Sequence, residues 1–360
     1  MNVMHLSPTW FGDQSVVGGG ERYAWELARA CAAETPTTFV SFAESAGSRQ
    51  EGPLRVRLLP NRANRPSPLE GNPFHPGLYA EIARADVIHC HQADTYPTNA
   101  AIVAGRMLAR KVFVSDLGGG HMRAPSLRLP ILPRATGMLL LSEYSKARWQ
   151  KEPASRRPRR AEVVYGGVDA RFAPSGERDP HHVLFVGRIV RHKGIEHAIA
   201  AIEPPFTMTV AGRNYDRPYA AMLRETAALR PVRFREDVAD AALPALYSSA
   251  LATVMPSTYD AWGGVHTDVP ELLGLAALES MACGTPAIVS RVGSLPELVE
   301  DGVTGFIVPP NDPAAIRDAL RTLAASPARR DEMGRAARAA VLARFTWQRT
   351  ARRCLEAYRQ

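Results

Sequence analysis

The stretch from Glu271 to Gly284, ELLGLAALESMACG, decides how the rest of the chain is interpreted. Seven residues separate its first carboxylate, Glu271, from a second one, Glu279, and the apolar run between them predicts a helix. We expect Glu279 within that helix and Glu271 at or just before its start. Eight residues of helix span about 12 Å, so these two groups cannot share one proton or one compact ion. They can contact two parts of an elongated ligand that is rich in hydroxyl groups.

The start of this helix adds a second kind of binding group. Free backbone N–H groups at Gly274 and Leu275 can bind a phosphate placed between the two carboxylates. The other interpretation of the same spacing is an ordinary amphipathic helix with two solvated glutamates. Apolar runs that predict short strands lie on both sides of it, at Leu251–Ser257 and Thr285–Ser290.

Length and composition predict two globular domains. The 360 residues are 46% hydrophobic and 22% charged, values typical of a water-exposed globular protein with room for two cores. No apolar run reaches the roughly 20 residues of a membrane span, and the first residues predict a strand rather than a secretory signal. The four cysteines show neither metal-binding nor disulfide spacing. We therefore expect a cytoplasmic protein with reduced thiols, no bound metal and no cofactor.

The net charge of +8 does not by itself identify a binding partner. The arginines are scattered apart from the run Arg156–Arg160, and no basic face with interleaved aromatic residues is visible. This pattern argues against a nucleic-acid partner and suits an anionic small ligand. The arginine run predicts a solvated loop, with contact to acidic lipid as the alternative.

The first half of the chain predicts a parallel sheet with polar residues at the ends of its strands. A strand at Val3–Ser7 leads to three glycines, Gly18, Gly19 and Gly20, which open a helix at Glu21–Ala33 and allow close approach to an anion. His91 ends a later strand, where ligands meet open α/β sheets, although a structural role is the usual one for a lone histidine. Further strands are expected at Thr37–Ser41, Arg55–Leu59, Asp86–His91, Val112–Ser115 and Met138–Leu141.

The second half repeats the alternation of strands and helices. A strand at Val183–Val186 is followed by Arg188 and Lys193, two cations that suit a diphosphate, or else form a solvated basic loop. Between the strand at Leu251–Ser257 and Glu271 lies a polar, aromatic loop from Thr258 to Pro270. Its Trp262 can stack on a sugar ring and its His266 can bind hydroxyls, or the loop is a surface excursion without contacts. The alternation predicts parallel sheets with helices on both faces.

These motifs together resemble the retaining glycosyltransferases of family 4, which are GT-B enzymes with an E-x7-E motif. The matches are Glu271 with Glu279, the segment Val186–Gly194 with its arginine and lysine, Glu26-Leu27-Ala28 after the glycines, and Val163–Asp169. The resemblance implies two Rossmann-like, doubly wound domains separated by a cleft. It places an acceptor domain at residues 1–169, a nucleotide-sugar domain at 170–344, and a helix at 345–360 that crosses back to the first domain.

The resemblance also implies roles for individual residues. Arg188 and Lys193 neutralise the donor diphosphate, together with the helix start at Gly274 and Leu275. Glu279 holds the ribose and Glu271 holds the sugar. Gly18, Gly19 and Gly20 face the donor phosphates or the acceptor.

One departure from the family lies after the strand Val112–Ser115. Family members commonly have a histidine directly after this strand; here Asp116 takes that position and His121 follows the glycines. Which of the two fills the polar role stays open, and Asp116 could also act as a base.

The function implied is a metal-independent, retaining transfer of a sugar from a UDP- or GDP-sugar to a small acceptor, with antibiotic biosynthesis as the expected setting. The alternatives are a lipid-linked or polysaccharide acceptor, and a module that binds nucleotide sugars without turnover. A pyridoxal-phosphate phosphorylase would need a lysine late in the chain, and none follows Lys193.

Overall fold

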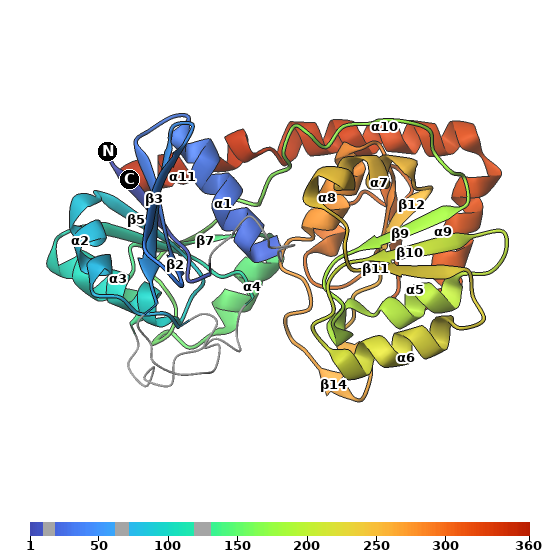
Figure 1. The fold of residues 1–360 in the computed structure, drawn as a ribbon, viewed down its shortest axis with the longest axis horizontal. Helices are drawn as coiled ribbons and strands as arrows, with labels where there is room; N and C mark the ends of the chain where they lie inside the picture. The colour runs from blue at the N-terminus through green and yellow to red at the C-terminus, as the bar shows by residue number, and fades with distance from the viewer. Residues whose placement is uncertain (10–18, 62–71, 119–130) are drawn as a thin grey trace. The chain divides into compact units, whose positions relative to one another are not determined.

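The computed structural model describes residues 1–9, 19–61, 72–118 and 131–360 (Figure 1). The chain divides into two compact units, each built around its own sheet. Unit 1 comprises Met1–Gly167 together with Trp347–Gln360, and unit 2 comprises Val168–Thr346. The expected domain limits, after Asp169 and after Arg344, lie next to these divisions.

Unit 1 contains an eight-stranded sheet in the order β3-β4-β2-β1-β5-β6-β7-β8. Its inner strands are buried on both faces and are largely apolar, although β1 (VMHL) and β5 (VIHCH) also carry buried histidines. All neighbouring strands are parallel except β3 and β4. The strands are β1 (Val3–Leu6), β2 (Thr37–Ala43), β3 (Gly47–Glu51), β4 (Leu54–Pro60), β5 (Val87–His91), β6 (Lys111–Ser115), β7 (Gly137–Leu140) and β8 (Ala161–Val163).

The antiparallel strand β3 was not among the predicted strands. It joins β4 through a tight turn in which Gly52 has a φ of 54°, a conformation that favours glycine. Its sequence, GSRQE, is polar and mostly exposed at the sheet edge. No apolar run marks such a strand, so the sequence gives little sign of it.

Helices cover both faces of this sheet. They are α1 (Gly19–Ala32), α2 (Gly77–Arg84), α3 (Tyr96–Met107), α4 (Glu143–Lys151) and α11 (Trp347–Arg359). The helix α11 comes from the far end of the chain and packs on α1, where the rings of Trp347 and Tyr23 meet edge to face at 5.4 Å. The start of α1 at Gly19 means that two of the three glycines are part of the helix itself.

Unit 2 contains a fully parallel six-stranded sheet in the order β11-β10-β9-β12-β15-β16. The strands are β9 (His182–Val186), β10 (Thr207–Ala211), β11 (Val232–Arg235), β12 (Ala252–Met255), β15 (Ala287–Ser290) and β16 (Gly305–Val308). Helices again cover both faces (Figure 1). They are α5 (Ile195–Ala201), α6 (Arg217–Ala227), α7 (Leu243–Ser249), α8 (Leu275–Ala282), α9 (Pro313–Ala325) and α10 (Pro327–Arg344).

The expected loop Thr258–Pro270 contains a small hairpin. Its antiparallel strands, β13 (Asp260–Ala261) and β14 (Val265–His266), are joined by Trp262, Gly263 and Gly264, and the φ values of 78° and 73° at the two glycines suit a tight turn. Among the described residues, none of the helices is both long and apolar enough to span a membrane.

Candidate functional site

Two of the expected donor residues form an ion pair in unit 2. Lys193 Nζ donates a hydrogen bond to Glu271 Oε1, and Ser257 Oγ donates to the same oxygen at 3.1 Å. The Glu271 side chain is 8% exposed, so it is not a solvated glutamate. Burial opposes ionisation of Glu271, but the charge and hydrogen bond of Lys193 outweigh it and hold the pKa of the carboxyl below its usual value. The site therefore presents a paired cation and anion at neutral pH.

The local backbone fixes this pair. Lys193 ends the 3-10 turn Arg191–Lys193, and Gly194 follows with a φ of 59° at the start of α5. A Cβ at Gly194 would overlap the carbonyl oxygen of Pro256, so this turn lies directly against the end of β12. The backbone N–H of Thr258 also donates to the carbonyl of His192 at 2.9 Å. The lysine turn and the segment that leads to Glu271 are thus held together.

Glu271 itself lies in a loop four residues before the helix begins at Leu275. The backbone N–H of Ser294 donates to the Glu271 carbonyl at 3.2 Å. Gly274 caps α8 in the left-handed conformation, with a φ of 85°, and a Cβ there would lie 2.8 Å from Leu295 Cδ2. The turn before the helix is therefore tightly packed, and this packing fixes the position of the Glu271 carboxylate.

Glu279 lies inside α8, as expected, and is buried. Tyr247 Oη donates a hydrogen bond to Glu279 Oε2 at 2.9 Å. Neither Tyr247 nor Ser257 was among the predicted site residues: Ser257 was noted only as the end of a strand, and Tyr247 belongs to no recognisable motif. Each is a hydroxyl donor: Ser257 orients Glu271, and Tyr247 orients Glu279.

Arg188 follows β9 and is exposed. Its guanidinium carbon lies 5.9 Å from the centroid of the Tyr215 ring. Nearby, burial and then the charge of Lys193 lower the pKa of His192 to about 4, so this histidine is neutral near pH 7. The turn after β9 thus carries two cations, the exposed Arg188 and the paired Lys193. It lies at the carboxyl end of the parallel strands, which is where α/β sheets bind ligands.

The hairpin places Trp262 against other side chains of unit 2. The guanidinium carbon of Arg191 lies 5.0 Å from the centroid of the Trp262 ring, and the Tyr219 ring lies 6.1 Å from it. Arg191 is itself bonded to Asp216, with Nε 2.7 Å from Oδ2. Contacts with Arg191 and Tyr219 thus already engage the ring that was expected to stack on a sugar.

His266 lies between two carboxylates on the exposed side of the hairpin. Its Nδ1 is 2.7 Å from Asp260 Oδ1, and its Nε2 is 3.2 Å from Asp268 Oδ1. Hydrogen bonds first to Asp260 and then to Asp268 raise the pKa of His266 above its ordinary value.

We expect this pair of bonds to make the hairpin pH-sensitive. Because the folded pKa of His266 is raised, its stabilisation is fully present below the unfolded pKa of about 6.5 and is lost as the pH rises through the folded pKa. An NMR titration of the imidazole should give a wild-type pKa above 6.5, and Asp260→Asn should lower it more than Asp268→Asn does. A wild-type pKa at or below 6.5 would contradict the pairing.

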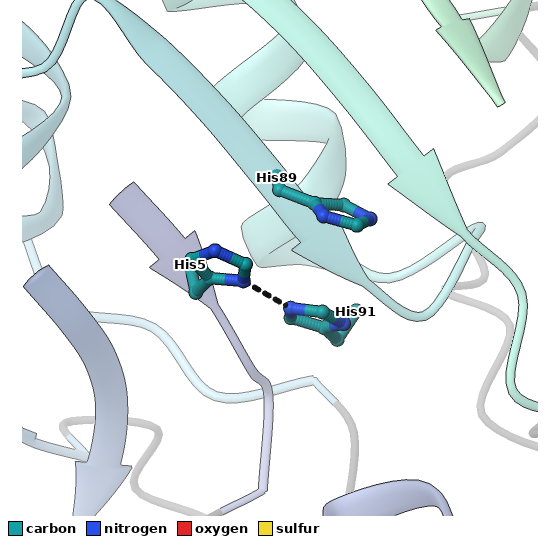
Figure 2. A group of neighbouring side chains, drawn as sticks. All are labelled: His5, His89 and His91. Carbon is teal, nitrogen blue, oxygen red and sulfur yellow. Dashed lines mark hydrogen bonds between the residues drawn. The ribbon is translucent and has the colours of Figure 1, made fainter. Parts of the chain in front are cut away.

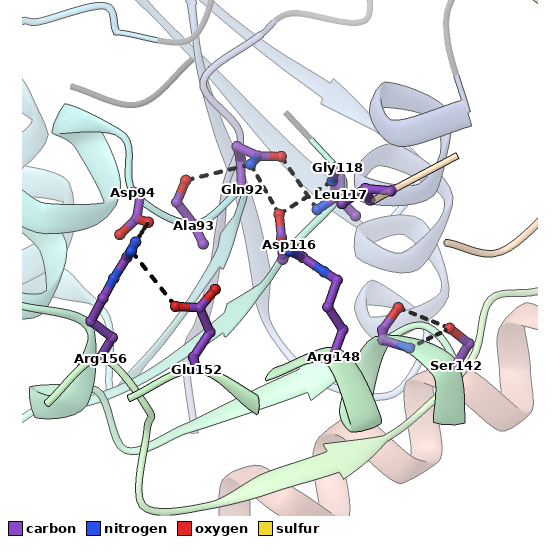
Figure 3. Close-up of polar contacts among 12 residues, drawn as sticks. Gln92, Ala93, Asp94, Asp116, Leu117, Gly118, Ser142, Arg148, Glu152 and Arg156 are labelled. Atoms are coloured by element: carbon purple, nitrogen blue, oxygen red, sulfur yellow. Dashed lines mark hydrogen bonds and ion pairs between the residues drawn. The ribbon is translucent and has the colours of Figure 1, made fainter. Parts of the chain in front are cut away.

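Asp116, in unit 1, is engaged rather than free (Figure 3). Its Oδ2 accepts from Arg148 at 2.8 Å, and its Oδ1 accepts from Gln92 Nε2 at 3.1 Å and from the backbone N–H of Gly118 at 3.2 Å. The side chain is buried. This pairing favours an anchoring role for the loop after β6 over that of a free base.

A second ion pair in Figure 3 involves the arginine run, whose Arg156 side chain is 41% exposed, as a solvated loop predicts. Arg156 donates to Asp94 Oδ2 at 3.3 Å and lies 3.6 Å from Glu152 Oε2. One member of the run expected to be solvated therefore ties two parts of unit 1 together.

His91 is buried on β5 and contacts two other histidines, His5 and His89, which the sequence analysis did not select (Figure 2). Its Nε2 lies 2.9 Å from His5 Nδ1. Burial lowers the pKa of His5 to about 3 and lowers those of His89 and His91 well below the usual value. Such burial favours a structural role for His91 over contact with an acceptor. A His-x-His pattern on a strand was the available signal.

The remaining candidates lie at or beyond the limits of the described residues. Gly19 and Gly20 form the first turn of α1, where a Cβ on Gly20 would meet Leu117 Cβ at 3.4 Å. Gly18 and His121 lie outside the described residues. The structure therefore brings Lys193 and Glu271 together in unit 2, and it leaves the choice between Asp116 and His121 open.

Two family models match successive parts of the chain. Residues 17–172 match a model described as Glycosyltransferase Family 4, and residues 169–340 match one described as Glycosyl transferases group 1.

Curated relatives agree with these matches. A glycogen synthase of Mycobacterium tuberculosis is 34% identical over 207 residues, which cover 54% of this chain and 47% of that protein. The chain thus spans about half the length of this relative. A D-inositol 3-phosphate glycosyltransferase of Acidothermus cellulolyticus is 27% identical over an alignment that covers 100% of this chain and 89% of the relative.

A solved structure shows the same fold. Alr3699/HepE of Anabaena, in complex with UDP-glucose, superposes with a TM-score of 0.76 at 18% identity, covering 99% of this chain and 98% of that one. The two parallel, helix-covered sheets are therefore those of a GT-B fold.

Proposed function

Because the chain belongs to glycosyltransferase family 4, we propose that it transfers a sugar from a nucleotide-sugar donor to an acceptor hydroxyl, with retention of configuration. The single observation that carries the proposal is the buried pairing of Lys193 with Glu271 at the carboxyl end of the unit 2 sheet. A buried ion pair contributes little net stability, since the desolvation of both groups offsets their attraction. Its position, beside exposed Arg188 and a helix start, suits a ligand that carries both phosphates and hydroxyls.

We assign each part of the donor to a group of unit 2. Arg188 and Lys193 neutralise the diphosphate, so the proposed transfer needs no metal ion for that purpose. Glu271 accepts hydroxyls of the sugar, and Glu279, oriented by Tyr247, accepts those of the ribose. Lys193 must turn from Glu271 towards the diphosphate when the donor binds, which also releases the carboxylate for the sugar.

The proposed chemistry balances without a covalent intermediate. The bond between the anomeric carbon and the diphosphate oxygen breaks, and the acceptor oxygen bonds to the same face of that carbon. The acceptor proton passes to the departing diphosphate. The cations at Arg188 and Lys193 stabilise the charge that develops on the leaving group, which is an electrostatic contribution to catalysis.

We propose a small, hydroxyl-rich acceptor such as a polyol or sugar phosphate. The support is the whole-chain match to a relative named for inositol 3-phosphate. The match to a glycogen synthase favours a polysaccharide acceptor as the second candidate. The relatives described above do not support the antibiotic setting that the sequence analysis expected.

A nucleotide-induced thermal shift tests the donor site. A ligand that binds only the folded state adds about 2.7 kcal/mol to apparent stability at 100 times its Kd. We expect one of UDP, GDP, ADP and dTDP to raise the melting temperature of the wild type and of the exposed control Glu225→Gln, and the shift to shrink strongly in Glu279→Gln. No shift with any nucleotide would overturn the donor assignment. A shift without turnover of any sugar donor would instead favour the non-catalytic binding module.

A further inference from the structure

Three histidines share one face of the unit 1 sheet, opposite the face packed by α2 and α3. His5 lies on β1 and pairs in register with His89 on the parallel strand β5, and His91 follows two residues later. Side chains alternate between the faces of a strand, so all three point the same way. Their sequence neighbours Met4 and Cys90 belong to the apolar core of the other face. Figure 2 shows the three rings gathered at one point.

The cluster is closed off from solvent. All three histidines are buried, and one ligating nitrogen from each lies within 4.8 Å of the others. Tyr23 of α1 approaches His91 with its ring 6.1 Å away, and Tyr358 of α11 approaches His89 with its ring 5.8 Å away. One tyrosine ring from each helix therefore covers the imidazoles.

Hydrogen bonds within the cluster do not satisfy it. His5 Nδ1 and His91 Nε2 bond to each other at 2.9 Å, and a neutral imidazole has one N–H and one lone pair. Whichever ring donates, one N–H and one lone pair remain on the outer nitrogens, His5 Nε2 and His91 Nδ1. Both of these atoms are buried and lack a hydrogen-bond partner among the described residues. An unpaired buried polar group costs about 1–3 kcal/mol, so the hydrogen-bonded pair is a costly arrangement. An ion held by the two inner nitrogens would replace the hydrogen bond between the rings but would leave both outer N–H groups unpaired.

His89 is already oriented as a ligand would be. Ser115 Oγ donates its hydrogen to the Leu139 carbonyl at 2.6 Å, so it can only accept from His89 Nε2, which lies 2.9 Å away. The lone pair of His89 is then on Nδ1, where it accepts the hydroxyl hydrogen of Tyr358 at 2.6 Å, so an ion bound at Nδ1 would displace that hydrogen bond. Metal-bound histidines are commonly held in this way, with the second ring nitrogen donating to a fixed acceptor.

We propose that His5, His89 and His91 bind one transition-metal ion of the Zn²⁺ class, with the hydroxyl of Tyr358 beside them. Imidazole nitrogen suits Zn²⁺, Cu²⁺ and Ni²⁺, and three histidines are a known zinc ligand set. Zn–N bonds of about 2.0–2.1 Å place tetrahedral ligand nitrogens about 3.3 Å apart. The nitrogens of His5 and His91, now 2.9 Å apart, would have to move slightly apart, and the nitrogens separated by up to 4.8 Å would have to move closer together. Small rotations of the rings supply both changes.

The proposed ion is structural and lies in unit 1. It would join β1 and β5 beneath α1 and α11, and it takes no part in the proposed sugar transfer. The rival state holds no metal: the two rings stay hydrogen-bonded to each other, and buried water bonded to an outer nitrogen would satisfy part of the deficit.

Metal analysis of the full-length protein separates these two states. The protein is produced with supplementary Zn²⁺, dialysed against a chelator and analysed by elemental mass spectrometry. We expect about one zinc per chain in the wild type and in the control His266→Gln, which removes an exposed histidine between two carboxylates. His91→Gln should hold less than a tenth of that. A wild type below a tenth of an ion per chain, or a loss only in His266→Gln, would overturn the proposal.

A second measurement covers variants that fail to fold. The wild type produced with Co²⁺ in place of Zn²⁺ should show the intense visible absorption of four-coordinate cobalt with nitrogen ligands. Absence of that band in a folded, cobalt-supplemented wild type overturns the site and leaves the metal-free cluster. Nucleotide-induced thermal shifts should be the same with and without the metal, so this test is independent of the donor assignment.

Discussion

A Lys193→Ala variant is expected to lose about 10²–10³-fold in kcat/KM, mainly through kcat. Lys193 is proposed to stabilise charge that develops on the departing diphosphate, and removal of one such preorganised group commonly costs this much. The effect on nucleotide affinity should be smaller, because the proposed contact of Arg188 with the diphosphate remains. Initial rates at several donor concentrations separate kcat from KM. A variant within tenfold of the wild type would contradict the assigned role.

The same substitution should also destabilise unit 2. Glu271 is left as a buried carboxylate without its cation, and breaking a buried pair costs about 3–5 kcal/mol. We expect the lower end of that range, because both side chains keep slight exposure. The double variant Lys193→Ala/Glu271→Gln removes the orphaned charge and should recover most of the stability without recovering activity. Recovery of activity along with stability would show that the single variant fails through misfolding.

A Gly194→Ala variant is expected to lower the unfolding free energy of unit 2 by about 2–5 kcal/mol. Left-handed backbone costs a side chain about 1–2 kcal/mol, and forced overpacking adds about 1–3 kcal/mol. Here the φ is 59°, and a Cβ would overlap the carbonyl oxygen of Pro256. The strand end would have to shift, and the lysine turn with it, so activity should fall as well.

Gly176→Ala provides a matched control for this prediction. Its φ of 66° is similar, but no described heavy atom lies within 4 Å of the added Cβ. We expect only the conformational cost of about 1–2 kcal/mol. Urea unfolding followed by circular dichroism measures the loss of stability in both variants. Equal losses in the two variants would mean that the close approach to Pro256 does not determine stability.

The buried parallel strands could be predicted from the sequence to within a residue or two. The run Val183–Val186 became β9 (His182–Val186), and Thr207–Ala211 became β10 with the same limits. Strands buried on both faces are rich in apolar residues, so most of them stand out from their surroundings. Polar edge strands such as β3 carry no such mark.

The candidate site was predictable only where it coincided with a motif. Arg188, Lys193, Glu271 and Glu279 were selected because their spacing matched a known series. The partners that orient them, Ser257 and Tyr247, are separated from motif positions by folded chain, and only the tertiary structure brings them within reach. The pairing of Asp116 with Arg148 was missed for the same reason.

The contribution of α11 to unit 1 has a consequence for the order in which the protein can mature on the ribosome. Unit 2 is contiguous in the chain, and its last residue, Thr346, is synthesised before α11 begins. Until then the histidine-bearing face of the first sheet lacks Tyr358, whose hydroxyl bonds His89 and whose carbonyl accepts from Lys111. Because domains generally fold as units during translation, the first unit to be started is the last to be completed. A premature stop before Trp347 would therefore release a nascent chain with an exposed interior, which is a substrate for chaperones and proteases rather than a shortened enzyme.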